Sequence, residues 1–203
     1  EEIFFRLNNS TPLTKPQKSK PLMGVENARF IDSILNGSFF SEKCSFSKLQ
    51  LRKSDDMCTL LQAMMLLDNR YQGYEYNSIS ADEVMRYSAF IKGNYCFKQQ
   101  SLLTTIIDYL DAAFDCKEKM LKKINLPIAV LMADTAIKRG ISADDFHDWF
   151  LYFFVSCKDY AQYCSSGSIK KEKVLGRIST MEQHFFKHFK LNAEESTADS
   201  EKV

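Results

Sequence analysis

The chain has 203 residues and a formal net charge of +1, and 45% of its residues are hydrophobic. This length suits one domain with at most a small appendage, and the near balance of charges excludes attachment to DNA by overall charge alone. The scarcity of turn residues, four Pro and seven Gly, argues against a many-stranded β fold.

The first quarter of the chain carries helix signals that polar breaks separate. Residues 1–8 have the spacing of the end of a short helix, and residues 8–12 break it with two Asn and a Pro. Thr14 is placed to cap a new helix. A further helix is predicted over residues 25–36, with Gly37 as its C-cap.

In the next part of the chain, acidic and hydroxyl residues mark the starts of helices. Ser54 precedes two aspartates and a run of Met and Leu at helical spacing. Residues 70–79 are polar and rich in Tyr, which indicates a loop. Ser80 and Glu83 have the spacing of a capping box, and the helix that follows is expected to stop at Gly93.

The second half of the chain contains the most apolar helical patterns. Helices are predicted over residues 99–115, 126–140, 142–154, 160–168 and 169–189, the fourth being short and ended by a Ser/Gly break. No segment has the alternation of a convincing strand. We therefore predict an all-α fold, an irregular or orthogonal bundle of about seven to nine helices. The helical domain is expected over residues 25–190, followed by a disordered acidic tail over 191–203.

Six cysteines occur without a C-x-x-C pair: Cys44, Cys58, Cys96, Cys116, Cys157 and Cys164. Several fall inside apolar helical patterns, so we interpret them as reduced, buried thiols rather than disulfides, and their spacings fit no zinc module. We expect no metal and no cofactor. No apolar stretch is long enough for a membrane span and no signal peptide is evident, so we predict a cytoplasmic protein without a membrane partner.

Three groups of titratable residues are candidates for a metal-binding or catalytic site. His184 and His188 share a helix face and could bind a metal, but the zincin pattern and a third ligand are missing. His147 lies among aspartates in a first helical turn, where capping explains the acids and no nucleophile is evident. Asp108, with Asp111 and Asp115, fits a solvated helix face better than a divalent-ion site. We therefore predict no catalytic residue.

Two basic clusters remain as candidate nucleic-acid contacts. The first contains Lys15, Lys18 and Lys20. The second is the start of the last helix, with Lys170, Lys171, Lys173 and Arg177. A Ser-Ser-Gly-Ser stretch leads into that helix, where exposed N–H groups and cations can hold a phosphate, although a plain solvated face explains them as well.

The opening stretch is similar to a segment of the ParB/sulfiredoxin-like superfamily. It resembles in particular a large family of unknown function whose core bears an Asp-Gly-Gln-Arg signature and whose ParB-like domain closes with a Phe-x-Arg-Leu-Asn stretch. The matching positions in this chain are Phe4, Arg6, Leu7, Asn8, Leu13 and Thr14, with Gln17 after them. Residues 1–24 would then be the trailing edge of an upstream ParB-like domain.

The resemblance implies that the chemistry lies upstream, because the signature itself does not occur in these 203 residues. Arg6 and Asn8 would border the upstream active site. The family occurs in phages, mobile elements and restriction or defence systems, which implies DNA-related work for the whole protein. It implies nuclease or NTPase chemistry for that protein and leaves activity of this piece open.

Our first hypothesis is a non-catalytic helical accessory domain of a ParB-like DNA-processing protein, contacting nucleic acid or regulating the upstream core. The alternative is a protein–protein interaction or scaffold domain without nucleic-acid binding. Its apolar surface would come from Met57, Met64, Met65 and the helix over 146–154, although core packing explains both. A metal-assisted nuclease using the histidines or the Asp108 face is not favoured, because no constellation is complete.

Overall fold

A computed structural model describes residues 12–192, which form helices joined by short loops. The α-helices are α2 (Lys15–Leu22), α3 (Val25–Asn36), α4 (Lys48–Arg52), α5 (Asp55–Gln72), α6 (Ala81–Ile91), α7 (Phe97–Ala113), α8 (Leu126–Lys138), α9 (Ala143–Ser156) and α10 (Lys171–His188). A π-helical turn, η1 (Phe39–Lys43), and a 3-10 helix, η2 (Lys158–Tyr163), bring the described helices to eleven, slightly above the predicted seven to nine.

The all-α prediction is confirmed. Over residues 12–192 the only β-type pairing is an isolated bridge between Ser78 and Lys170. The predicted hydroxyl caps also hold: Thr14, Ser80 and Ser142 each accept a hydrogen bond from the backbone N–H three residues later. These bonds satisfy N–H groups that a helix start leaves unpaired, and so they fix where α2, α6 and α9 begin.

Two local expectations differ from the structure. The predicted loop at 70–79 starts later, because α5 continues to Gln72. Arg70 and Tyr71 extend this last turn by binding the carboxylate of Asp134 on α8. The short helices η1 and α4 were not expected, since neither is long enough to show a period of its own.

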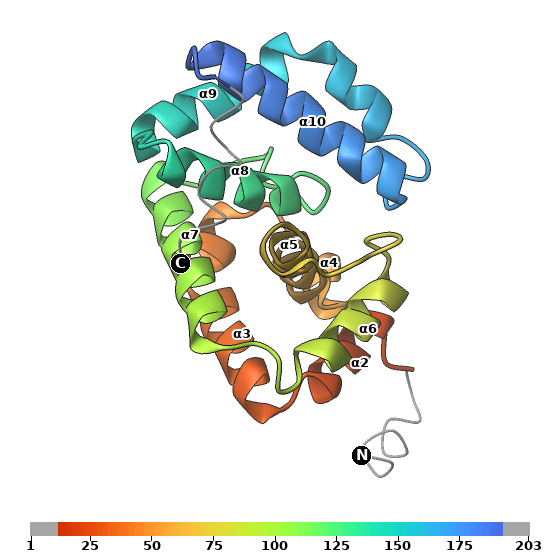
Figure 1. Cartoon of the computed structure of the whole chain (residues 1–203). Helices are drawn as coiled ribbons and strands as arrows, with labels where there is room; N and C mark the ends of the chain where they lie inside the picture. Colours follow the sequence, from red (N-terminus) through yellow and green to blue (C-terminus); the bar gives the residue numbers. More distant parts are fainter. Residues whose placement is uncertain (1–11, 193–203) are drawn as a thin grey trace.

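Helix α5 lies at the centre of the fold, where Figure 1 shows it end-on inside a ring of other helices. All twelve residues from Met57 to Asp68 are buried, so α5 is enclosed around its whole circumference rather than on one face. It packs against α2, α3, α4, α6 and α8. The prediction that Met57, Met64 and Met65 serve the core is confirmed by their exposed fractions of 4%, 1% and 0%.

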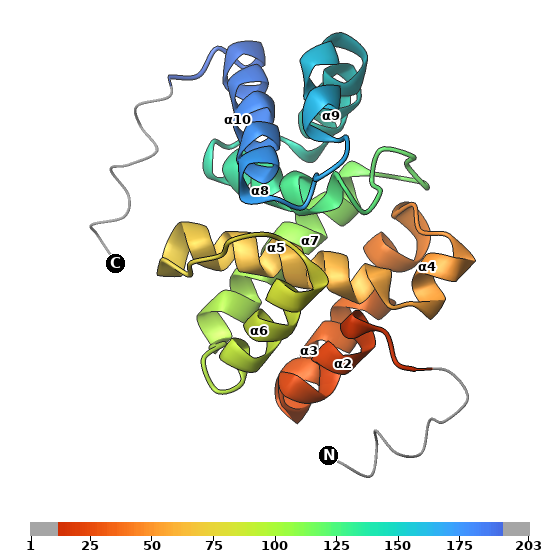
Figure 2. The ribbon, with the colours of Figure 1, turned by 90° about the vertical axis from the view of Figure 1, so that its right-hand side faces the viewer.

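The helices stack in levels around α5. Figure 2 shows α8, α9 and α10 above it and α2, α3 and α6 below it. Helix α2 packs mainly on α6, so residues 15–22 are part of the same packed body as the rest of the described chain. Whether residues 1–24 also close an upstream domain stays a prediction, and most of the predicted tail, from residue 193 on, lies outside the described residues.

A partly buried ionic network joins three of these helices. Arg70 on α5 donates from Nη1 to Asp134 Oδ2 on α8 over 3.0 Å, and from Nη2 to Glu182 Oε1 on α10 over 2.8 Å. The Asp134 side chain is only 2% exposed, so its charge depends on these partners. The network therefore fixes the upper level against α5.

All six cysteines are free thiols, with Cys44 and Cys58 buried and Cys96 and Cys116 exposed. The expectation of reduced thiols therefore agrees with the structure, but burial does not extend to all of them. None of the helices described is both long enough and apolar enough to cross a lipid bilayer.

Candidate functional site

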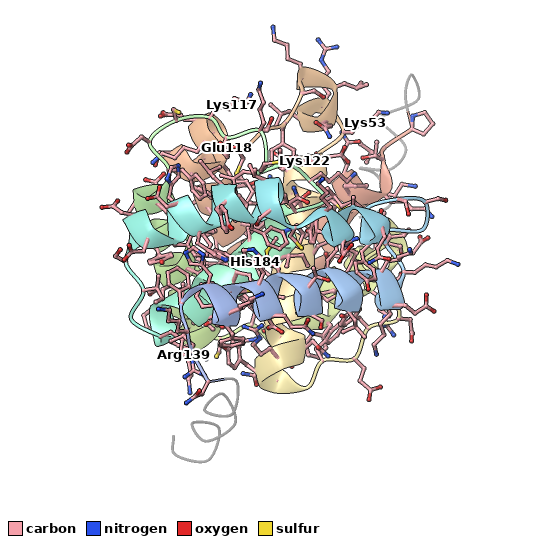
Figure 3. All side chains as sticks on the ribbon, turned by 90° about the horizontal axis from the view of Figure 1, so that it is seen from above. Lys53, Lys117, Glu118, Lys122, Arg139 and His184 are labelled. Atoms are coloured by element: carbon pink, nitrogen blue, oxygen red, sulfur yellow. The ribbon has the colours of Figure 1, made fainter. Side chains whose placement is uncertain are left out.

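A concentration of positive charge without ion-pair partners in the described chain arises where two distant segments run side by side. The Ser45 N–H donates to the Leu121 carbonyl over 2.8 Å, and the Glu118 N–H donates to the Lys43 carbonyl over 2.9 Å. These bonds place residues 43–53 against residues 117–123. We call the exposed cations of the two segments the basic face: Lys48, Arg52, Lys53, Lys117, Lys119 and Lys122. Figure 3 shows Lys53, Lys117 and Lys122 on one side of the molecule, away from His184.

None of the six basic-face side chains forms an ion pair with a residue in the described range. Two neighbouring lysines do: Lys43 pairs with Asp111 and Lys123 with Asp55, each over 2.8 Å. Glu118 is the only acid in the two segments, and its carboxylate accepts the Met120 N–H. Gathering like charges without partners raises the energy of the folded state. Such an unfavourable arrangement is typical of a surface that binds an anion.

Helix α4 and its C-cap residue Lys53 project three of these cations, because the helix buries none of its own residues. Ser47 and Gln50 form a reciprocal capping box at its start. At its end, α2 satisfies its carbonyls: Thr14 Oγ1 donates to the Lys53 carbonyl and Gln17 Nε2 to the Arg52 carbonyl, each over 3.0 Å. The helix is therefore held at both ends while its side chains stay exposed.

A shallow groove of about 280 Å³ lies at one end of the basic face. Its lining comes from α2, α5, α6 and the turns beside them: Thr14, Pro16, Lys53, Asp55, Cys58, Gln62, Ile79, Ser80, Ala81, Lys123 and Ile169. Asp55 and Ala81, the first residues of α5 and α6, are among them, as is Thr14, the N-cap of α2, so three helices have their positive ends at the groove.

The groove connects the two basic clusters that the sequence indicated separately. Thr14 and Pro16 flank Lys15, and Ile169 directly precedes Lys170. Lys15 is exposed and pairs with Asp82 over 2.7 Å, while the half-buried Lys18 has no ion pair in the described chain. Sequence neighbours of both clusters thus line one groove.

At the start of α10, two of the three predicted lysines already have partners. Lys170 is exposed and has no ion pair with a described residue. Lys171 Nζ lies 5.3 Å from the centre of the Tyr76 ring, and Lys173 Nζ donates to the Gln162 carbonyl over 2.8 Å. Lys170 is therefore the freest cation of this cluster.

Arg177 does not belong with these surface lysines, and its grouping with them is corrected. Its side chain is 1% exposed, and Nη1 donates to the carbonyls of Tyr163 and Ser168 over 2.9 and 2.8 Å. Burial lowers the pKa of this guanidinium from its usual value. The spacing signals this position, because Arg177 falls between the buried Val174 and Met181 on one helix face.

The His184–His188 pair is not arranged as a metal site. Trp149 Nε1 donates to His184 Nδ1 over 3.1 Å, and Ser156 Oγ lies 3.0 Å from His184 Nε2. An indole N–H can only donate, so Nδ1 accepts and the neutral ring carries its proton on Nε2. Both ring nitrogens are therefore engaged.

The Ser156–His184 contact also lacks the arrangement of a nucleophile and its base. A general base needs an unprotonated nitrogen facing the hydroxyl, whereas Nε2 carries the proton here. The Ser156 hydroxyl donates to the Tyr152 carbonyl over 2.8 Å. Burial, together with His188 and Lys187, lowers the pKa of His184 below its usual 6.5.

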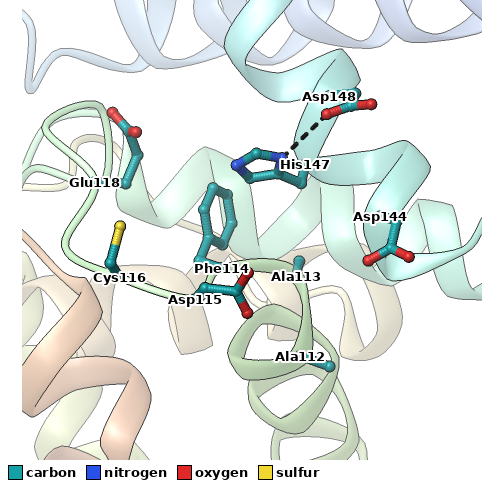
Figure 4. Close-up of a pocket in the computed structure, with 9 residues that line it drawn as sticks. All are labelled: Ala112, Ala113, Phe114, Asp115, Cys116, Glu118, Asp144, His147 and Asp148. Carbon is teal, nitrogen blue, oxygen red and sulfur yellow. Dashed lines mark hydrogen bonds and ion pairs between the residues drawn. The ribbon is translucent and has the colours of Figure 1, made fainter.

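His147 lines a cavity of about 390 Å³ with four carboxylates, from Asp115, Glu118, Asp144 and Asp148. His147 Nδ1 is 3.2 Å from Asp148 Oδ1, and its ring meets the edge of Phe114 at 5.3 Å. Figure 4 shows the carboxylates spaced around the cavity rather than converging on one position.

The Asp108 group is also dispersed. Asp108 and Asp115 are exposed, whereas Asp111 binds Lys43 and Ser38. Despite its partial burial, these hydrogen bonds lower the pKa of Asp111. Over residues 12–192, no three His, Cys, Asp or Glu side chains are grouped so that they could hold a metal ion.

Comparisons with protein-family models, curated proteins and solved structures found no match for this chain. Arg6 and Asn8, which carry part of the ParB-like resemblance, lie outside the described residues, so the family assignment stays a prediction. Sequence reasoning missed the basic face itself. The Lys/Arg-rich runs at 48–53 and 117–123 were its signal, although only the fold shows that they meet.

Proposed function

We propose that this chain is a nucleic-acid-binding helical domain that contacts the phosphate backbone through the basic face. The observation that carries the proposal is the gathering of six exposed cations, none with an ion-pair partner in the described chain. Backbone bonds between segments about seventy-five residues apart bring them together. Phosphate contacts of this kind position a protein on nucleic acid without reading its sequence.

The groove and the lysines beyond it extend the same surface. Lys53 belongs to the basic face and also lines the groove, and Lys170 directly follows Ile169 of the lining. A polyanion that follows this line would meet cations along the whole path. The net charge of +1 leaves the rest of the molecule without a comparable attraction, so binding depends on this one surface.

The scaffold alternative is weakened as far as it relied on the aromatic helix and the methionines. Phe146, Phe150 and Phe153 are 0% exposed. Like the methionine cluster of α5, they lie in the core. These residues therefore offer no apolar surface to a partner protein.

The test is a triple variant, Lys53→Ala, Lys117→Ala and Lys122→Ala, titrated against a short labelled DNA by fluorescence anisotropy. We expect the dissociation constant to rise about tenfold to a thousandfold, because each lost phosphate contact removes released counterions. The matched control replaces Lys92, Lys98 and Lys187 by Ala, three exposed lysines on other elements, and keeps the same net charge as the test variant. Equal affinities for the two triple variants would contradict the proposal.

A further inference from the structure

The groove beside the basic face combines an apolar wall with positive charge at its rim. Pro16, Cys58 and Ile79 are buried and form its base, while Ile169 stands at the edge with 47% of its surface exposed. We propose that this groove takes one unpaired nucleotide of a bound strand, with the base against Ile169 and the phosphate toward Lys53. This inference rests on the proposed function and specifies which form of nucleic acid the surface prefers.

The charges around the groove favour a phosphate near Lys53. Asp55, the acid of the lining, pairs with Lys123 over 2.8 Å, and Asp82, next to Ala81 of the lining, pairs with Lys15 over 2.7 Å. Lys53 has no such partner in the described chain, so its charge is uncompensated. The positive ends of α2 and α6 add to the same field.

The inner end of the groove holds a polar atom that suits a base edge. Gln62 is 4% exposed, and its Nε2 donates to the Ile79 carbonyl over 2.6 Å. Its Oε1 has no hydrogen-bond partner among the described residues, so it is free to accept. Every nucleobase offers an amino or imino N–H on its pairing edge, and apolar side chains can cover its face.

The size of the groove points to a single nucleotide rather than a larger ligand. Its volume of about 280 Å³ is near the lower end of ligand pockets, which usually span about 300–1,000 Å³. A base in a duplex is stacked and paired, so it would have to leave the helix at a cost of a few kcal/mol before entering. A base in a single strand carries no such pairing cost. The groove therefore predicts a preference for unpaired strands.

The chain provides a matched pair of variants for the test. Ile169 lines the groove with 47% exposure, and Leu175 on α10 lies outside its lining with 48% exposure. Labelled single-stranded DNA and the duplex of the same sequence are each titrated with the parent chain, Ile169→Ala and Leu175→Ala. A second variant, Ala81→Trp, fills the groove from α6 without changing a charge, and circular dichroism checks that all variants keep their helices.

We expect the parent chain to bind the single strand more tightly than the duplex. Ile169→Ala and Ala81→Trp should weaken single-strand binding about tenfold, because the base loses its apolar contact or its space, and leave duplex binding unchanged. Leu175→Ala should change neither. Equal binding of both DNA forms by the parent, with no effect of the groove variants, would overturn this inference and leave the basic-face proposal standing. Failure of the parent to bind either form would overturn both.

Discussion

The interior around α5 and the basic face are built in opposite ways. From Met57 to Asp68, α5 has no exposed residue, and its position follows from burying apolar side chains on every side. The basic face is exposed throughout and is held together by backbone bonds from Ser45 and Glu118. The side chains of the interior therefore determine stability, whereas those of the basic face are free to bind a ligand.

The largest difference in stability between the two regions is expected when the same residue type is truncated in both. Leu61 on α5 is 0% exposed and Leu49 on α4 is 58% exposed. Leu61→Ala should lower the free energy of unfolding by about 2–5 kcal/mol, because it leaves a cavity in a packed core. Leu49→Ala should change it by less than about 0.5 kcal/mol. Urea denaturation followed by circular dichroism measures both, and similar losses would show that α4 is also part of the core.

Ion pairs in the interior and at the surface should also differ in how much they contribute to stability. Arg70→Met removes the closest cationic partner of the buried Asp134 and leaves Lys138 Nζ 3.9 Å away, so it should lower the free energy of unfolding by about 3 kcal/mol. This is near the low end for a buried pair, because Tyr71 still donates to Asp134. Lys20→Met is the control, because Lys20 and Asp32 are 47% and 42% exposed, and its cost should stay below about 1 kcal/mol. A small effect of Arg70→Met would mean that water already solvates Asp134.

A smaller effect is expected from pH at the α9–α10 contact. The pKa of His184 is lower in the folded chain than its ordinary value of 6.5, so below pH 6.5 the unfolded chain binds a proton that the native chain lacks. Stability is therefore complete above pH 6.5 and falls as the pH drops through that value toward the folded pKa. Protonation would also set the His184 Nδ1–H against the indole N–H of Trp149.

The measurement compares urea denaturation of the parent and of His184→Gln on both sides of pH 6.5. The loss of stability on acidification should be smaller in the variant, since Gln does not titrate. Equal pH dependence in the two proteins would assign the effect to other groups. His147→Gln serves as the control, because it removes a histidine that does not contribute to the lowered pKa of His184.

The predictable part of the fold is the part that local chemistry determines. Thr14, Ser80 and Ser142 mark helix starts because each hydroxyl accepts a hydrogen bond from an N–H that is just three residues later in the sequence. The helix over 25–36 agrees with α3 residue for residue, because Gly24 and Gly37 bound a regular apolar period. These signals lie within a few residues of each other in the sequence.

The candidate site could not be predicted in the same way, because it depends on contacts between distant segments. The bond from Ser45 to Leu121 joins two segments that are far apart in the sequence, and the residues near either one give no sign of the other. Helix α4 has five residues and needs α2 to satisfy its carbonyls. Arg177 shows the reverse error: its residue type indicated a surface, while its place in the helical period indicated the interior.

The salt dependence of nucleic-acid binding tests the central claim most directly. For the parent chain, the logarithm of the association constant should fall linearly with the logarithm of the salt concentration. Replacing Lys53, Lys117 and Lys122 by Ala should reduce that slope by about 2–3, close to one for each phosphate contact removed, while the urea midpoint stays unchanged. A slope that is the same in parent and variant, or binding that does not respond to salt, would contradict the assignment of phosphate binding to the basic face.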